Sequence, residues 1–238
     1  FLADADGPVS VRHVADRLSL APSTTHRLLN LLVESGFAMY ETKTATYAVG
    51  PEFYRVSAKV SSTVSPVNIA HGAISALAQR FDETVLFALY LRQAGKITFM
   101  SRADGQKKLL YRVEMNTPLS VIWGASGKAA LAYLPEEEVR AILAVEEASP
   151  ATGDAPPDYD TLADELAGIR QKGFCVSHGE KLPGALGIAA PVFGPQRVVG
   201  TICMTMPNDR APSMSHDELG KAVLEAARHL TRQLGGTP

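Results

Sequence analysis

The chain has 238 residues, with 23 lysines and arginines against 25 aspartates and glutamates, and a formal net charge of −2. It is too long for one small DNA-binding module, and long enough for such a module plus a second domain with its own core. No segment approaches the roughly 20 consecutive apolar residues of a membrane span, and no signal-peptide layout begins the sequence. We therefore expect a cytoplasmic protein that makes no membrane contact.

The first motif is a pair of helices between residues 9 and 36. A stripe at the i, i+3, i+4, i+7 spacing of a core-facing helix consists of Val11, Val14, Ala15 and Leu18. A second helix opens at Pro22, whose missing N–H costs nothing at a helix start, and carries Leu28, Leu29, Leu31 and Leu32 toward its far end. Its first turns present polar side chains suited to base edges and phosphates in a major groove: Ser23, Thr24, Thr25, His26, Arg27 and Asn30. The alternative is an ordinary helical hairpin packed in a core.

Two β-prone runs, residues 36–40 and 46–49, flank a loop at 41–45 and predict a hairpin, so the helix pair is winged. Residues 42–46, with Lys43, are expected to touch the DNA backbone. The first fifty residues hold four cations (Arg12, Arg17, Arg27, Lys43) against five acids (Asp4, Asp6, Asp16, Glu34, Glu41). We therefore expect modest affinity per subunit and pairing on a two-fold operator.

A helix at 51–60 follows, with Phe53, Val56 and Val60 at helical spacing, and it breaks at 61–66 in a segment typical of a hinge. An inert spacer fits the composition equally well. The predicted domains are thus a winged helix-turn-helix domain (1–50), a linker helix (51–66) and an effector-binding domain (67–238).

The second domain is predicted as α+β, an antiparallel sheet covered by helices. Its expected strands are 84–91, 97–102, 107–113, 174–177, 186–193 and 198–206. Its expected helices are 67–81, 127–134, 136–147, 158–172 and 214–234, with a loop at 148–157.

One loop of this domain has the composition of a ligand site. Small residues at Gly124, Ala125 and Ser126 stand just before a helix, where backbone N–H groups can point at an anion such as a carboxylate. Trp123 offers a flat apolar wall, and Cys203 and Thr205 point to one face of a strand that could close the pocket. The alternative is a tight loop whose small residues serve helix-on-sheet packing.

The sequence resembles the IclR family of bacterial transcriptional regulators from residue 2 to about residue 235. The matching stretches include residues 14–29, 32–37 and 47–50, Gly127 to Ala132, Gly173-Phe174 with Glu180 after it, and residues 188–193. The resemblance implies a GAF-like effector domain, operator DNA and a small organic acid as partners, and dimers that pair into tetramers. The family's first helix is represented only by residues 1–3, so we expect the chain to begin inside it.

Within the family, three segments line the effector cavity: the loop at 124–126, the strand after the Gly-aromatic pair, and the last sheet strand. The resemblance thereby adds Ser177, His178 and Gly187 to the ligand contacts. Trp123 falls in a short insertion relative to the usual family spacing. Ser177 and His178 stand where several relatives carry acidic residues. Both departures count against a short keto acid, and the added Trp123 favours an aromatic or otherwise flat acid.

Other functions have weaker support. Cys175 and His178 would point to opposite faces of a strand, which prevents the thiol–imidazole contact of a nucleophilic enzyme. The histidines (His13, His26, His71, His178, His216, His229) have no paired ligand spacing, so we expect no metal and no cofactor. Two cysteines are too few for a disulfide scaffold. A redox-sensing module triggered by Cys175 or Cys203 is the remaining alternative, and it needs an exposed thiol of low pKa.

Overall fold

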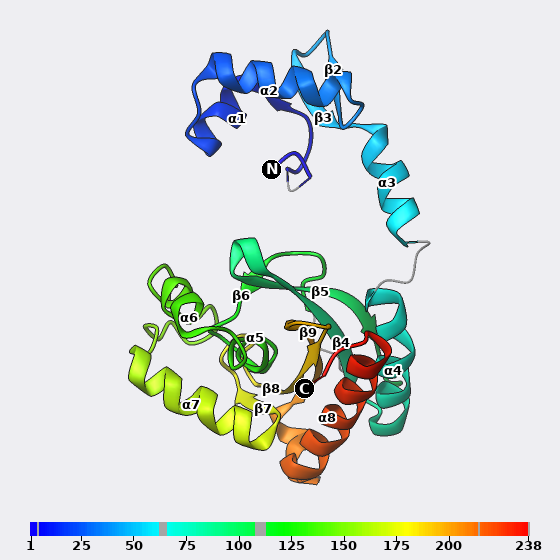
Figure 1. Cartoon of the computed structure of the whole chain (residues 1–238), viewed down its shortest axis with the longest axis vertical. Coiled ribbons are helices and arrows are strands. Elements are labelled where there is room, and N and C mark those ends of the chain that lie inside the picture. The colour runs from blue at the N-terminus through cyan, green and yellow to red at the C-terminus, as the bar shows by residue number, and fades with distance from the viewer. Residues whose placement is uncertain (4, 62–65, 108–112, 214, 238) are drawn as a thin grey trace. The chain divides into compact units, whose positions relative to one another are not determined.

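The computed structural model describes residues 1–3, 5–61, 66–107, 113–213 and 215–237, and it divides into two compact units, residues 1–65 and 66–238 (Figure 1). The elements of the first unit are β1 (Val9–Ser10), α1 (Val11–Leu18), α2 (Pro22–Glu34), β2 (Ala38–Glu41), β3 (Thr46–Val49) and α3 (Pro51–Ser61). Its strands form an antiparallel sheet in the order β1-β3-β2. Strand β1 was not predicted; the helix pair and the hairpin were, and both are confirmed.

Local sequence signals set the ends of the two helices. Ser10 caps α1, because its Oγ accepts a hydrogen bond from the backbone N–H of His13 at 3.2 Å. The helix ends at Ser19, which adopts a left-handed conformation with φ of 53°. Pro22 then begins α2, as the missing N–H predicts.

The core of the first unit is small. Val14, Leu29 and Tyr47 are buried at its centre, with Val9, Val11 and Val33 packed around them. The prediction that Leu18 faces the core is wrong, because the small sheet and the neighbouring helix cover only one side of α1. The exposed apolar residues include Leu18 (48%), Leu28 (41%), Leu31 (50%) and Leu32 (38%).

The second unit is built on a curled six-stranded antiparallel sheet in the order β6-β5-β4-β9-β8-β7. Its strands are β4 (Thr84–Leu91), β5 (Lys96–Ala103), β6 (Leu119–Ser120), β7 (Cys175–His178), β8 (Ala185–Phe193) and β9 (Val198–Pro207). Its helices are α4 (Pro66–Phe81), α5 (Ala125–Leu131), α6 (Glu136–Leu143), α7 (Tyr159–Lys172) and α8 (His216–Gln233), with short 3₁₀ segments at 92–94 and 208–213.

Helices cover both faces of this sheet. Helices α4 and α8 lie side by side on one face, and α5, α6 and α7 lie on the other (Figure 1). Strand β9 shows why both faces are buried: Ile202 and Met204 point toward α4 and α8, while Cys203 and Thr205 point to the α5 face. The α+β architecture is as predicted.

Two predicted features fall largely outside the described residues. The strand expected at 107–113 includes residues 108–112, and the break expected at 61–66 includes residues 62–65. The two-residue strand β6 was not predicted. Of the helices that the structure describes, none has the length and hydropathy needed to span a membrane.

Candidate functional site

The N-terminal half of α2 presents an open polar surface. Ser23, His26 and Arg27 are exposed and Thr24 is half-buried. Ala21, the residue before the helix, provides no side-chain cap, and among the described residues no side chain accepts a hydrogen bond from the first-turn backbone N–H groups. Such a helix start attracts anions because its N–H groups and the helix dipole both favour negative charge.

Thr25 does not belong to this surface. Its side chain is 1% exposed, and its Oγ1 donates a hydrogen bond to the Ala21 carbonyl at 3.1 Å. The expectation that Thr25 is available to base edges is therefore wrong. The residue stands four positions before Leu29, so the two share the buried face of the helix.

Asn30 is tied to the hairpin. The Tyr47 hydroxyl on β3 donates a hydrogen bond to Asn30 Oδ1 at 3.2 Å, and Asn30 Nδ2 lies 3.3 Å from His26 Nδ1. Burial raises the pKa of Tyr47, so its hydroxyl is a hydrogen-bond donor over an even wider pH range than an ordinary tyrosine. Tyr47 and His26 thus fix the orientation of the Asn30 amide. Asn30 itself is exposed.

Lys43 lies exposed at the tip of the β2–β3 hairpin. The hairpin loop is ordered locally: the Lys43 backbone N–H donates to Glu41 Oε1 at 3.1 Å, and the hydroxyls of Thr44 and Thr46 lie 2.7 Å apart. Ala45 completes the turn in a left-handed conformation with φ of 53°. This geometry presents the lysine at the end of a defined wing.

The second unit contains a cavity of about 300 Å³ between α5 and the sheet. Seven of the nine residues predicted for a ligand line it: Gly124, Ala125, Ser126, Ser177, Gly187, Cys203 and Thr205. The other lining residues are mostly apolar (Leu86, Phe99, Val113, Leu119, Pro150, Leu182 and Ala185), with Gly179 and the charged residues Glu114, Glu180 and Lys181. We call this cavity the effector pocket. Its volume is at the lower end of the range typical of small-molecule sites.

Two glycines allow α5 to approach its neighbours. A Cβ on Gly127 would lie 2.5 Å from the Cα and carbonyl oxygen of Val121. A Cβ on Gly187 would lie 3.3 Å from the Cβ of Ala125. Gly127 is therefore small because of packing, as one of the two sequence interpretations holds. Residues 124–126 line the cavity, as the other interpretation holds.

The backbone donors expected to hold a ligand's carboxylate are already occupied. The Gly124 N–H donates to Glu180 Oε2 at 3.0 Å, and the Ala125 N–H donates to Ser177 Oγ at 3.0 Å. The expectation of free N–H groups at these two positions is wrong, because a side-chain carboxylate of the same chain lies there. Ser126 retains a hydroxyl with no partner among the described residues.

Glu180 is held by a buried lysine. Lys128 Nζ donates to Glu165 Oε1 at 2.7 Å and lies 2.9 Å from Glu180 Oε2, and its side chain is 7% exposed. Burial acts to lower the pKa of Lys128, but the two carboxylates outweigh it and raise the pKa overall. The charge on Glu180, which lines the pocket, is thus balanced by the buried ammonium group of Lys128.

Lys181 supplies a second cation in the wall. Its Nζ donates to the Ser120 carbonyl at 2.8 Å, and no carboxylate forms an ion pair with it among the described residues. Burial lowers the pKa of Lys181 to about 8. The carboxylates of Glu146 and Glu180 act to raise this pKa, but burial has the larger effect.

Two predicted ligand contacts lie elsewhere. Trp123 is 7% exposed, does not line the cavity, and donates its indole N–H to the Glu147 carbonyl at 3.1 Å. His178 is exposed at the end of β7, where its Nδ1 lies 3.3 Å from Asn208 Oδ1 and its ring packs against His216. Trp123 is thus a core residue and His178 a surface residue.

The sequence interpretation missed Glu180 and Lys181 as pocket residues. Both lie in the turn between β7 and β8, which folds back over the start of α5. The signal for them was a pair of adjacent charges in a glycine-containing turn between two apolar strands, Gly179-Glu180-Lys181.

The cysteines do not have the environment of a redox trigger. Cys175 and Cys203 are both buried and free. Burial raises the pKa of the Cys203 thiol to about 12 and raises that of Cys175 further. Cys175 and the exposed His178 diverge, as their spacing on a strand predicts. Within the described ranges, no group of His, Cys, Asp or Glu side chains could hold a metal ion.

A winged helix pair followed by a separate α+β domain is an architecture typical of transcriptional regulators. Family comparisons agree. Residues 58–232 match the C-terminal domain of the bacterial transcriptional regulator IclR, and residues 1–41 match the IclR helix-turn-helix domain. The chain belongs to the IclR family.

Individual relatives are similar over nearly the whole chain. The HTH-type transcriptional regulator BhcR of Paracoccus denitrificans is 26% identical over 94% of this chain and 80% of its own length. The transcriptional repressor IclR of Escherichia coli is 24% identical over 99% and 86%. These relatives are regulators and repressors, not enzymes.

Solved structures show the same fold. An IclR transcriptional regulator from Silicibacter superposes with a TM-score of 0.84 at 24% identity, covering 97% of this chain and 90% of the other. An IclR homologue from Microbacterium hydrocarbonoxydans, solved as a complex with 4-hydroxybenzoate, gives a TM-score of 0.71 at 18% identity over 96% and 92%.

Proposed function

We propose that this regulator binds operator DNA through α2 and the β2–β3 wing, and that a small aromatic carboxylic acid in the effector pocket changes its affinity for the operator. DNA binding follows from the family; the residues that contact DNA, the effector and the direction of its effect are our proposal. The observation that carries it is the pairing of an open polar helix start with a cavity in a separate unit.

The proposed DNA contacts divide between bases and backbone. Ser23, Thr24, His26 and Asn30 offer hydroxyl, imidazole and amide groups to base edges. Arg27 and Lys43, together with the uncapped N–H groups of α2, contact phosphates or guanine edges. Because this unit is not basic overall, we propose that two copies bind together on a two-fold site, as dimers or tetramers.

Arg27→Ala tests the reading surface. We expect operator affinity to fall about tenfold or more, since a bidentate arginine contact provides about 1–3 kcal/mol. Electrophoretic mobility shift or fluorescence anisotropy on the chain's own operator measures this loss. Lys221→Ala on α8 removes one exposed positive charge far along the chain and is the matched control. Equal affinities for the Arg27 variant and wild type would overturn the assignment.

The proposed effector contacts rest on the chemistry of the pocket wall. The Lys181 ammonium and the hydroxyls of Ser126 and Thr205 suit a carboxylate, and Leu86 and Phe99 suit an apolar or aromatic body. The homologue crystallised with 4-hydroxybenzoate supports an aromatic acid as the first compound to try.

A pair of cysteine variants tests the pocket. Cys203 lines the cavity and Cys175 is buried outside it, so Cys203→Leu fills space that Cys175→Ala leaves intact. We expect a panel of aromatic and aliphatic carboxylates, measured by isothermal titration calorimetry, to bind wild type and Cys175→Ala with similar affinity, and to bind Cys203→Leu at least tenfold more weakly. Unchanged binding to Cys203→Leu would place the effector elsewhere. Loss of the response in Cys175→Ala alone would instead favour a thiol trigger.

A further inference from the structure

A second concave site in the second unit has no role in the function above. It has a volume of about 220 Å³ and is lined by residues that include Tyr133, Arg170, Lys172, Phe193 and Arg228. We call it the basic pocket. It contains three cations, and none of its described lining residues is acidic.

The three cations come from different elements. Arg170 and Lys172 lie in the last turn of α7, while Arg228 lies on α8. Leu224, Arg228 and Thr231 share one face of α8 at i, i+4, i+7 spacing, and this face closes the pocket. Among the residues that the structure describes, no carboxylate forms an ion pair with Arg170, Lys172 or Arg228.

Two further groups shape the site. The ring of Tyr133 packs edge-on against Phe193 with centroids 5.0 Å apart, and its hydroxyl has no hydrogen-bond partner in the described part of the chain. Arg170 Nη1 donates to the Ala132 carbonyl at 2.9 Å, which fixes the guanidinium beside the tyrosine. The Tyr133 hydroxyl and the remaining guanidinium N–H groups are therefore available as donors.

A simpler role for the cations is to balance helix ends. Helices α5 and α7 both end here, and each helix C-terminus carries at most about half a negative charge. Those two ends together account for about one positive charge of the three. Arg228 lies in the interior of α8 and balances no helix end, so about two positive charges remain.

We propose that the basic pocket binds a small phosphorylated anion, either free phosphate or a phosphate monoester. A dianion matches the residual charge, and guanidinium groups and a phenol hydroxyl donate to phosphate oxygens. The site is distinct from the effector pocket: residues 124–126 line the effector pocket at the start of α5, whereas Ala132 and Tyr133 follow the end of the same helix.

The test is equilibrium dialysis of the full chain with inorganic phosphate and, separately, glycerol 3-phosphate, at constant ionic strength in chloride. We expect one bound anion per chain, and a loss of affinity of about tenfold or more in Arg228→Gln, because the variant removes a charge-assisted hydrogen bond. Preference for the monoester identifies it as the ligand; preference for phosphate identifies the free anion.

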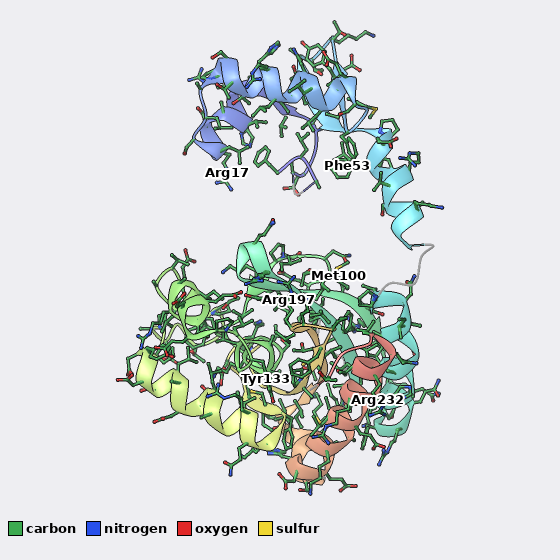
Figure 2. The ribbon with its side chains drawn as sticks, viewed as in Figure 1. Arg17, Phe53, Met100, Tyr133, Arg197 and Arg232 are labelled. Atoms are coloured by element: carbon green, nitrogen blue, oxygen red, sulfur yellow. The ribbon has the colours of Figure 1, made fainter. Side chains whose placement is uncertain are left out.

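Arg232→Gln is the matched control. Arg232 lies one turn further along α8, and it lines a different surface that faces α4 (Figure 2). We expect this variant to bind phosphate like wild type. Absence of binding by wild type, or an equal loss in both variants, overturns the proposal.

A surface for a second copy of the chain is the competing explanation for these cations. Sedimentation velocity of wild type and Arg228→Gln in phosphate-free buffer separates the two. An unchanged oligomeric state in the variant agrees with an anion site. A lowered oligomeric state, without any effect on phosphate binding, overturns it.

Discussion

The polar surface of α2 and the wall of the effector pocket satisfy their polar groups in opposite ways. On α2, hydroxyl, imidazole and guanidinium groups point to solvent, and the first-turn N–H groups have no side-chain cap. In the pocket, the N–H groups of Gly124 and Ala125 and the ammonium groups of Lys128 and Lys181 all have partners within the chain. A large partner can bind the open surface directly, whereas a small ligand must fit between groups that are already paired.

The first prediction tests the packing on which the pocket depends. Gly127→Ala places a methyl group 2.5 Å from the Val121 backbone, which cannot move as a side chain tip would. We expect the free energy of unfolding to fall by about 3 kcal/mol or more in urea denaturation.

Gly168→Ala is the control for this substitution. Gly168 lies inside α7, and a Cβ there meets nothing within 4 Å. We expect this variant to gain up to about 1 kcal/mol, because alanine favours a helix over glycine. A similar small change in both variants would mean that α5 does not require its close approach to residue 121.

The second prediction concerns Lys181 and pH. Its pKa of about 8 lies below the ordinary 10.5, so between these values the unfolded chain binds more protons and the contribution of Lys181 to stability rises with pH. Binding of an acid has the opposite dependence, since a carboxylate needs the ammonium form. We expect effector affinity to fall about tenfold or more from pH 7 to pH 9.5.

Lys181→Met provides the comparison in the same calorimetric titration. We expect it to bind the acid more weakly at pH 7 and to lose most of the pH dependence between pH 7 and 9.5. An identical pH profile in the variant would show that another group pairs with the ligand.

The third prediction has the smallest expected effect. It tests whether Thr25 stabilises the fold without contacting DNA. Thr25→Val keeps the buried shape and removes the hydrogen bond to the Ala21 carbonyl, so we expect a loss of about 1 kcal/mol in stability. Operator affinity, measured below the unfolding temperature, should stay within about threefold of wild type. A tenfold loss of affinity in a folded Thr25→Val protein would return this residue to the DNA-reading surface.

The elements of the first unit could be predicted because their signals are local. Proline is favoured at the first position of a helix, as at Pro22, and the loop at 41–45 joins two short β-prone runs. Which side chains of α2 face the core was harder to predict, because the exposed side of the helix also carries leucines. Thr25 could have been recognised from its spacing of four residues before Leu29.

The pocket was only half predictable, because it depends on contacts between distant segments. Residues 124–126 could be identified by their size and their place before a helix. Glu180 contacts Gly124 across 56 positions of sequence, and only the fold brings them together. Trp123 was wrongly predicted to contact a ligand because it is next to the pocket loop in sequence. Its side chain points away from the pocket into the core.

Glu180 gives the effector pocket a built-in competitor. A carboxylate attached to the same chain acts at an effective concentration in the millimolar range or above at the Gly124 N–H, so a free acid must outcompete it to take that position. On the proposed function, we expect simple acids such as formate or acetate, which offer no further contacts, to bind only when they are very abundant. We expect a larger acid that also packs against the apolar wall to be favoured over them.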